Sequence, residues 1–165
     1  MEKLIKKAKK GDEEAFFKLI EINKISLYKA GRAILNNDED VADAIQETVI
    51  SAYRNIKSLK DDSYFKTWLT KILINKCKDI ISKNKETVIL SDYAEEGYIQ
   101  EFLSEFEIED MLNDLSKEQK LVMSLYYISQ FNTREISEIL KEPEGTIKSR
   151  ISRAKTKLRK SFAMR

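Results

Sequence analysis

Residues 133–161 constrain the fold of this 165-residue chain more than any other segment. Residues 133–140 have the apolar spacing of a short helix, for which Thr133 is the expected N-cap. The only proline, Pro143, follows in a turn and suits the first position of a second helix, from 143 to 161. Two helices joined by a turn of this length form a helix-turn-helix, which can place its second helix in the DNA major groove. The segment therefore predicts a nucleic-acid-binding protein.

The second of these helices is apolar on one narrow face and basic elsewhere. Its apolar side chains recur at 3.6 residues per turn: Ile147, Ile151, Ala154 and Leu158. The opposite face carries Ser149, Ser152, Arg153, Thr156 and Lys160, and the flanks carry Lys148, Arg150, Lys155, Lys157 and Arg159. A solvated basic face is the simplest alternative. The helix and tight turn that precede it favour contact with phosphates and bases instead.

The composition predicts an all-α fold. Four glycines and one proline leave little for β-turns, and Lys, Glu, Ile and Leu recur at helical spacing. The single cysteine, Cys77, lies in an apolar run and is expected in the core, and the absence of histidine argues against a zinc or haem site. There is no run of 18 apolar residues and no signal peptide, so we expect a cytoplasmic protein without cofactors.

Charge is strongly segregated along the chain, although the net charge is only +2. Residues 1–83 carry a net +4, residues 84–118 a net −9, and residues 119–165 a net +7. Two basic lobes joined by an acidic connector suit a protein that holds one nucleic acid at two separate points. We therefore predict two small helical domains, residues 1–83 and 109–165, joined by an acidic linker over residues 84–108.

Helix start signals appear in both predicted domains. Ser116 and Gln119 have the spacing of a capping box, and the helix that follows has Leu121, Val122, Leu125 and Ile128 on one side. In the first domain, Asp12 is an expected N-cap, and residues 36–40 form a loop and cap before a helix over 41–54. That helix can turn Val41, Ile45, Val49 and Ala52 inward and leave Asp43, Gln46 and Glu47 outside. From the residues alone, this polar face is merely solvated.

Residues 59–79 interleave aromatic side chains with lysines. Thr67, Lys71, Asn75 and Lys78 share one stripe, with Trp68 beside it. Stacking surfaces next to cations bind single-stranded bases. The alternative is that Phe65 and Trp68 are ordinary core aromatics, and the residues alone leave both interpretations equally open.

Four motifs follow one another along the chain: Gly11–Phe16, Asp40–Thr48 with Ala52–Arg54, Phe65–Leu69 with Ile72, Asn75 and Asp79, and Gly145–Lys155. In this order, and over residues 8 to 162, they resemble the extracytoplasmic-function (ECF) sigma factors, small bacterial initiation subunits of RNA polymerase. The resemblance implies a first domain that binds core polymerase and melts the −10 promoter element. It also implies a second domain that recognises the −35 element, and no catalytic residue in either domain.

The resemblance also assigns residues to each role. Contacts to the clamp helices of the polymerase β′ subunit fall on Asp40, Asp43, Gln46 and Glu47. The residues implied to contact the −10 element are Lys60, Asp62, Ser63, Tyr64, Phe65, Trp68, Lys71 and Asn75. Within this set, the loop from Lys60 to Tyr64 is implied to bind a base flipped out of the non-template strand. The residues implied to contact the −35 element are Thr146, Lys148, Ser149, Arg150, Ser152, Arg153 and Lys155. The implied partners are core RNA polymerase (the β′ clamp helices and the β flap), promoter DNA and an anti-sigma factor, which in this family is often membrane-anchored, with no small-molecule substrate.

The chain departs from the family pattern at three places. Val49 stands where the family often has phenylalanine, residues 80–85 are less basic than usual, and Tyr64 adds an aromatic to the base-capturing loop. The weakly basic stretch reduces the case for contacts to the spacer DNA between the two promoter elements.

Two other classes of function fit part of the sequence. One is an autonomous helix-turn-helix regulator that binds duplex DNA without polymerase. The string Thr146-Ile-Lys-Ser-Arg and the lack of a preceding receiver domain argue against a response regulator. The other is an enzyme acting on nucleic acid, which requires clustered carboxylates or a general base. The acidic residues of the connector are irregularly spaced and have no histidine among them.

Overall fold

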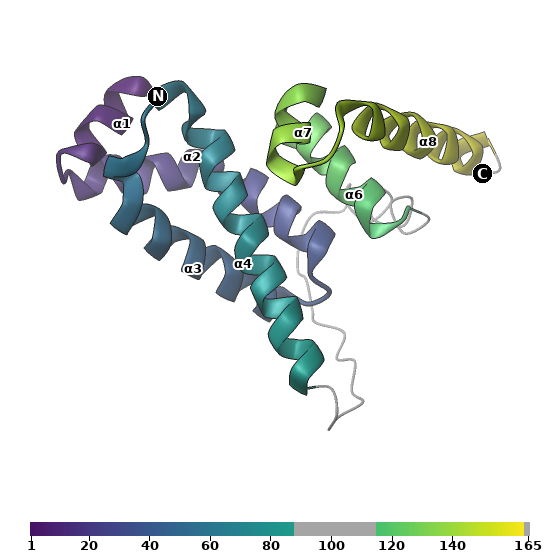
Figure 1. Ribbon diagram of the computed structural model, residues 1–165, viewed down its shortest axis with the longest axis horizontal. Helices are drawn as coiled ribbons and strands as arrows, with labels where there is room; N and C mark the ends of the chain where they lie inside the picture. Colours follow the sequence, from purple (N-terminus) through teal and green to yellow (C-terminus); the bar gives the residue numbers. More distant parts are fainter. Residues whose placement is uncertain (88–114, 164–165) are drawn as a thin grey trace. The chain divides into compact units, whose positions relative to one another are not determined.

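The computed structural model describes residues 1–87 and 115–163, and it divides the chain into two compact units, residues 1–94 and 95–165. Within the described residues every regular element is helical (Figure 1). The predicted all-α fold with two helical units is therefore confirmed. Most of the predicted linker, residues 88–108, lies outside the described residues, and residues 84–87 continue the last helix of the first unit.

The described part of the first unit, residues 1–87, contains four α-helices and two short 3₁₀ turns. They are α1 (Glu2–Lys9), α2 (Glu13–Ile34), α3 (Asp38–Asn55), η1 (Ile56–Ser58), η2 (Asp62–Tyr64) and α4 (Phe65–Thr87). Asp12 caps α2 as predicted, because its carboxylate accepts a hydrogen bond of 2.9 Å from the Ala15 N–H. Asn37 caps α3 in the same way, accepting from the Asp40 N–H at 2.7 Å.

The core of the first unit lies where α2, α3 and α4 pack against one another (Figure 1). Its largest fully buried side chains are Ile5, Phe16, Leu19, Leu27, Val41, Phe65, Leu69 and Leu73. Gly31 allows α3 to approach α2 closely, since a Cβ at that position would stand 3.1 Å from Val41 Cγ1. Cys77 is fully buried, as predicted.

The buried face of α3 differs from the predicted one. Val41 and Ala52 are buried as expected, but the other inward side chains are Ala44 and Thr48. Ile45 and Val49 are only half-buried. The Thr48 hydroxyl satisfies its own hydrogen bond by donating to the Ala44 carbonyl at 2.7 Å, so this polar side chain can occupy the core.

The second unit contains α6 (Lys117–Met123), the π-helical turn η3 (Ser124–Ile128), α7 (Thr133–Leu140) and α8 (Glu144–Ala163). The capping box of Ser116 and Gln119 is present as predicted. The predicted N-cap of α7 is wrong by one residue: Asn132 forms a capping box with Glu135. Thr133 instead donates from its hydroxyl to Glu144 Oε1 at 2.6 Å and so joins the starts of α7 and α8.

The helices of the second unit share one apolar core. It includes Val122, Leu125, Ile136, Ile139, Ile147, Ile151 and Ala154, all at most 6% exposed. Ile128 was expected on the same side as Leu125, but it is 43% exposed because η3 changes the helical period between them. Lys141 ends α7 in the left-handed conformation (φ 57°), which turns the chain toward α8.

Candidate nucleic-acid interface

The outer face of α8 carries the residues predicted to read DNA. Lys148, Ser152 and Arg153 are exposed, while Thr146, Ser149, Arg150 and Lys155 are half-buried. Ile147, Ile151 and Ala154 fix this orientation because they are buried on the opposite side. The structure therefore places all seven predicted residues on one helix, with three of them exposed to solvent.

Two of the cations on α8 are held by acidic neighbours. Arg150 Nη1 lies 2.7 Å from Glu142 Oε2 in the turn before the helix, and Lys148 Nζ lies 2.9 Å from Glu144 Oε1. The hydrogen bond from Thr133 and then that from Lys148 lower the pKa of Glu144. These contacts make Arg150 a support for the turn and leave Arg153 as the more accessible arginine.

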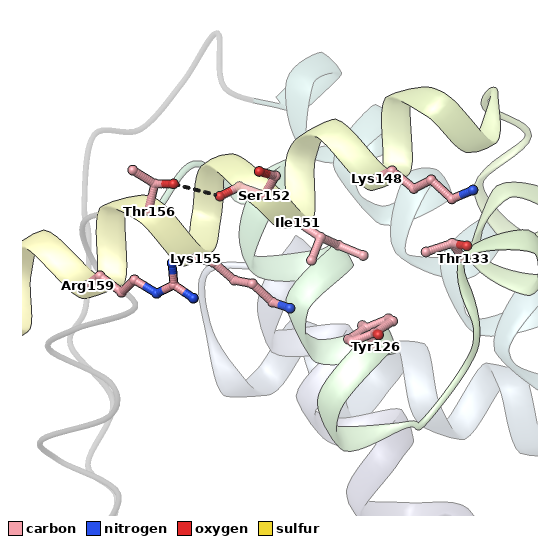
Figure 2. A pocket seen from close by; sticks show the side chains of 8 residues that line it. All are labelled: Tyr126, Thr133, Lys148, Ile151, Ser152, Lys155, Thr156 and Arg159. Atoms are coloured by element: carbon pink, nitrogen blue, oxygen red, sulfur yellow. Dashed lines mark hydrogen bonds between the residues drawn. The ribbon is translucent and has the colours of Figure 1, made fainter.

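A hollow of about 360 Å³ lies beside α8, between that helix, η3 and the start of α7 (Figure 2). Eight side chains line it: Tyr126, Thr133, Lys148, Ile151, Ser152, Lys155, Thr156 and Arg159. Lys155 Nζ sits 5.7 Å and 5.5 Å from the ring centroids of Tyr126 and Tyr127, and a hydrogen bond with Tyr127 raises the pKa of this lysine. Three cations around one polar hollow can receive the phosphates of a DNA strand.

Tyr126, Tyr127, Thr156 and Arg159 were not among the residues predicted to read the −35 element, although Thr156 and Arg159 were expected on the solvent-facing surface of this helix. Arg159 and Thr156 could have been found, because they lie one turn beyond Lys155 and Ser152 on the same helix. The two tyrosines come from η3, and only the fold brings them to α8. Their adjacency just before the helix-turn-helix was the one available sequence signal.

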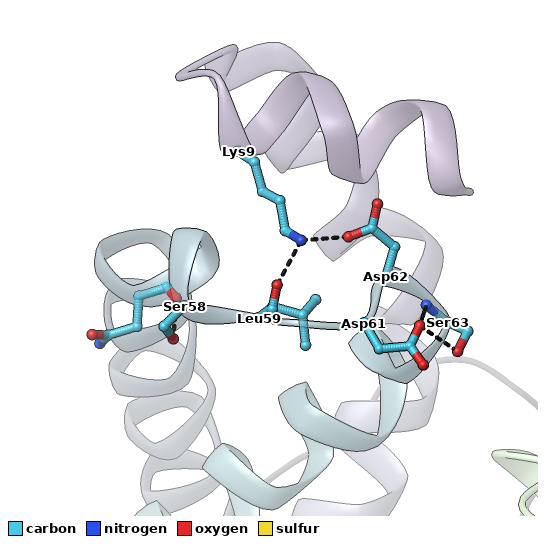
Figure 3. Close-up of polar contacts among 7 residues, drawn as sticks. Lys9, Ser58, Leu59, Asp61, Asp62 and Ser63 are labelled. Atoms are coloured by element: carbon cyan, nitrogen blue, oxygen red, sulfur yellow. Dashed lines mark hydrogen bonds and ion pairs between the residues drawn. The ribbon is translucent and has the colours of Figure 1, made fainter.

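The loop predicted to receive a flipped base is held by an internal cap (Figure 3). Asp61 Oδ1 accepts hydrogen bonds from the Ser63 N–H at 2.9 Å and the Ser63 hydroxyl at 2.7 Å. These two bonds lower the pKa of Asp61. Lys60, Ser63 and Tyr64 are exposed, with Tyr64 at 42%, so the loop presents a hydroxyl, a cation and an aromatic ring to solvent.

Asp62, another predicted loop residue, is turned toward the body of the unit. Its carboxylate is ion-paired with Lys9 at the end of α1 and its side chain is 18% exposed (Figure 3). In this conformation Asp62 joins the loop to α1.

The four predicted residues on α4 divide between core and surface. Asn75 is exposed, and Lys71 and Trp68 are half-buried. Phe65 is completely buried, so the prediction that it contacts the −10 element as a stacking surface is corrected: the core alternative holds for this ring. Thr67, expected on the polar stripe with Lys71, is also buried. Trp68 packs beside Phe65, with the ring centroids 6.0 Å apart, and keeps one part accessible.

The residues predicted to bind core polymerase line a groove of about 440 Å³ between α3 and α4. Asp40, Asp43, Gln46 and Glu47 form one wall, and Lys76, Asp79, Ile80, Lys83 and Asn84 form the other. Asn84 donates to Asp40 Oδ2 at 3.1 Å, and Lys76 Nζ lies 3.6 Å from Glu47 Oε2. Only the residues of the α3 wall were predicted, because the α4 wall depends on how the two helices pack.

Neither a metal site nor a membrane span is found in the part of the chain that the structure describes. No group of three or more Cys, Asp or Glu side chains there could hold a metal ion. No helix in the two described ranges is long and apolar enough to cross a membrane.

Two family models match this chain, one for each unit. Residues 19–87 match sigma-70 region 2, and residues 105–158 match sigma-70 region 4. The first match contains the α3–α4 groove and the loop from Lys60 to Tyr64, and the second contains the helix-turn-helix.

Curated relatives match over nearly the whole chain. The ECF RNA polymerase sigma factor SigW of Bacillus subtilis is 33% identical over 98% of this chain and 96% of its own length. The ECF RNA polymerase sigma-E factor of Haemophilus influenzae is 29% identical over 92% of this chain and 89% of its own length.

Solved structures share the fold. The sigma factor RpoE of Bartonella quintana, solved with the anti-sigma factor NepR, has a TM-score of 0.72 at 24% identity, covering 88% of this chain and 94% of that one. CnrH, solved with the cytosolic domain of CnrY, has a TM-score of 0.70 at 22% identity, covering 99% and 97%. The chain, with its two sigma-region matches and its full-length similarity to SigW, belongs to the family of ECF RNA polymerase sigma factors.

Proposed function

We propose that this protein binds core RNA polymerase and directs it to promoters that carry a −35 and a −10 element, where it nucleates DNA melting. The observation that carries the proposal is the full-length relationship to ECF sigma factors, which covers both units in the same order. The protein performs no covalent chemistry in this scheme, because RNA synthesis belongs to the polymerase. Its place of action is the cytoplasm, where promoter DNA and polymerase are found.

Each proposed contact follows from the chemistry of its surface. On α8, Lys148, Ser152 and Arg153 enter the major groove of the −35 element, and the phosphates lie along the hollow lined by Lys155 and Arg159. On the first unit, an unpaired base is received by the loop from Lys60 to Tyr64, with Trp68, Lys71 and Asn75 along the strand. Capture of that base lowers the cost of strand separation.

The polymerase contact is assigned to the groove between α3 and α4. Asp40, Asp43 and Glu47 give its α3 wall three carboxylates, which suit a basic helical partner such as the β′ clamp helices. The second unit is proposed to dock on the β flap, and the acidic linker to occupy the RNA exit channel by resembling RNA in charge. An anti-sigma factor that covers these surfaces is the proposed regulator.

The competing function is an autonomous regulator that binds duplex DNA alone. A binding experiment separates the two: the chain is titrated with sigma-free core polymerase and, separately, with duplex DNA at physiological salt. A sigma factor forms a stoichiometric complex with core polymerase and binds free duplex feebly. Tight sequence-specific duplex binding without a polymerase complex would favour the autonomous regulator.

A further inference from the structure

A lysine outside the DNA-binding surface is joined to the base-capturing loop. Lys9 is the last residue of α1, and its ammonium group donates to the Leu59 carbonyl at 2.6 Å and is ion-paired with Asp62 (Figure 3). The side chains of Lys9 and Asp62 are 23% and 18% exposed, so the pair is largely shielded from solvent. One side chain thus binds the chain on both sides of Lys60 and Asp61.

The loop also has apolar anchors and internal hydrogen bonds. Leu59 is buried and anchors its start, and Phe65 is buried and anchors its end. Between them, Asp61 and Ser63 are bonded to each other, and the Tyr64 N–H donates to the Asp61 carbonyl at 3.1 Å. These bonds shape the loop internally and do not set its position on the unit. The hydrogen bond and the ion pair of Lys9 join the loop to α1 and so help to set that position.

The same contact also changes the electrostatics of the loop. The loop contains two adjacent carboxylates, Asp61 and Asp62, at the place where a polyanionic strand is proposed to bind. An ammonium group bonded to Asp62 offsets one of these charges at short range, where shielding from solvent strengthens the interaction. Lys60, which points to solvent, then remains available to the strand.

We propose that Lys9 is a positioning residue for promoter melting. It acts through Asp62 and the Leu59 carbonyl, holds the loop in the shape that receives an unpaired base, and does not itself touch DNA. The inference rests on the proposed function of the loop. Lys9 is not needed to attach α1, since Ile5 and Ala8 are buried and hold that helix in place.

The test compares two neighbouring lysines in the full chain bound to core polymerase. Lys9→Met keeps the aliphatic stem and removes the ammonium group, and Lys10→Met makes the same change at an exposed neighbour. The probe is a single-stranded −10 oligonucleotide, taken from mapped promoters, with either the captured base or an abasic position. The ratio of the two affinities reports base capture alone.

We expect Lys9→Met to reduce this ratio by about fivefold to tenfold, the range for losing a partly shielded charged hydrogen bond. Its melting temperature and its affinity for core polymerase should match those of Lys10→Met. Lys9→Arg, which can keep both contacts, should restore most of the ratio. Asp62→Asn, which keeps the size of the side chain but removes the ion pair, should lower it as Lys9→Met does.

Several outcomes would overturn the inference. An unchanged ratio in Lys9→Met and Asp62→Asn would show that the loop needs no such support. A loss of affinity for both oligonucleotides together with a lower melting temperature would show a purely structural role. If the wild-type complex produced no promoter-specific transcripts, the proposed function itself would fail, and that result is separate from any effect of Lys9.

Discussion

The two arginines at the centre of α8 have different surroundings. Arg150 is held 2.7 Å from Glu142, whereas Arg153 is exposed on the face opposite the buried Ile151 and Ala154. An arginine that bonds a guanine edge contributes about 1–3 kcal/mol of discrimination between bases. The exposed arginine is therefore the better candidate for reading sequence, and the paired one for holding the turn.

Arg153→Ala should reduce promoter-specific transcription by roughly fivefold to a hundredfold, the equivalent of one lost base contact. Affinity for core polymerase should not change, because the α3–α4 groove lies in the other unit. Run-off transcription and a polymerase-binding titration measure the two effects. Lys117→Ala removes the same charge from the exposed start of α6 and serves as the control. Equal loss of transcription and polymerase binding in Arg153→Ala would contradict this division of roles.

Cys77 gives a prediction at alkaline pH. Burial raises the pKa of its thiol from 9.0 to about 12. Between these values the unfolded chain loses the thiol proton and the folded chain keeps it. The thiol therefore lowers stability as pH rises from 9 to 12 and has no such effect below pH 9. Urea denaturation of the wild type and Cys77→Ala should show a stability difference that shifts in favour of the variant over this range. A constant difference would contradict the buried, neutral thiol.

Among the elements, α7 depends on its cap. The Asn132 side chain accepts a hydrogen bond from the Glu135 N–H at 2.9 Å, and the Glu135 carboxylate accepts one from the Asn132 N–H at 2.8 Å. Loss of a cap of this kind costs about 1 kcal/mol. Asn132→Ala should destabilise the second unit by about that amount in thermal unfolding, while Asn132→Asp, which can still accept, should stay near wild type. A loss of stability in Asn132→Asp as large as that in Asn132→Ala would contradict the cap assignment.

Element boundaries show what the sequence could and could not specify. Asp12 and the Ser116–Gln119 box were predictable, because caps depend on residues within one turn of each other. The predicted cap at Thr133 is wrong, because asparagine and threonine are both good cap residues and only the hydrogen bonds between Asn132 and Glu135 show which of the two caps α7. Ile128 was misplaced because η3 interrupts the 3.6-residue period.

In the candidate site, too, local sequence patterns predicted some features and tertiary packing decided the others. Residues on one helix face, such as Lys148 and Arg153, follow from the helical period alone. Phe65 could not be placed, because an aromatic ring at helical spacing is equally suited to a core or to a base, and the packing of α4 on its neighbours decides. The ion pair of Lys9 with Asp62 joins residues 53 positions apart, so a local sequence pattern could not predict it.

In the whole molecule, both ends of the chain carry a net positive charge, and the acidic surface of interest lies in the groove of the first unit. The α3 wall of the groove is acidic, while the chain from residue 119 onward carries a net +7. Glu47→Lys should weaken binding to core polymerase about tenfold or more, since it places a like charge opposite a basic partner and beside Lys76. Glu2→Lys makes the same change on an exposed side chain outside the groove and should have little effect. Unchanged affinity in Glu47→Lys, with the fold retained, would remove the groove assignment.

Run-off transcription tests the central claim most directly. The purified chain is combined with sigma-free bacterial core polymerase on fragmented genomic DNA from the source organism. We predict discrete transcripts that require the chain and whose start sites share two spaced upstream elements. Absence of such starts, together with a shift of duplex DNA by the chain alone, would contradict a sigma factor and support an autonomous DNA-binding regulator.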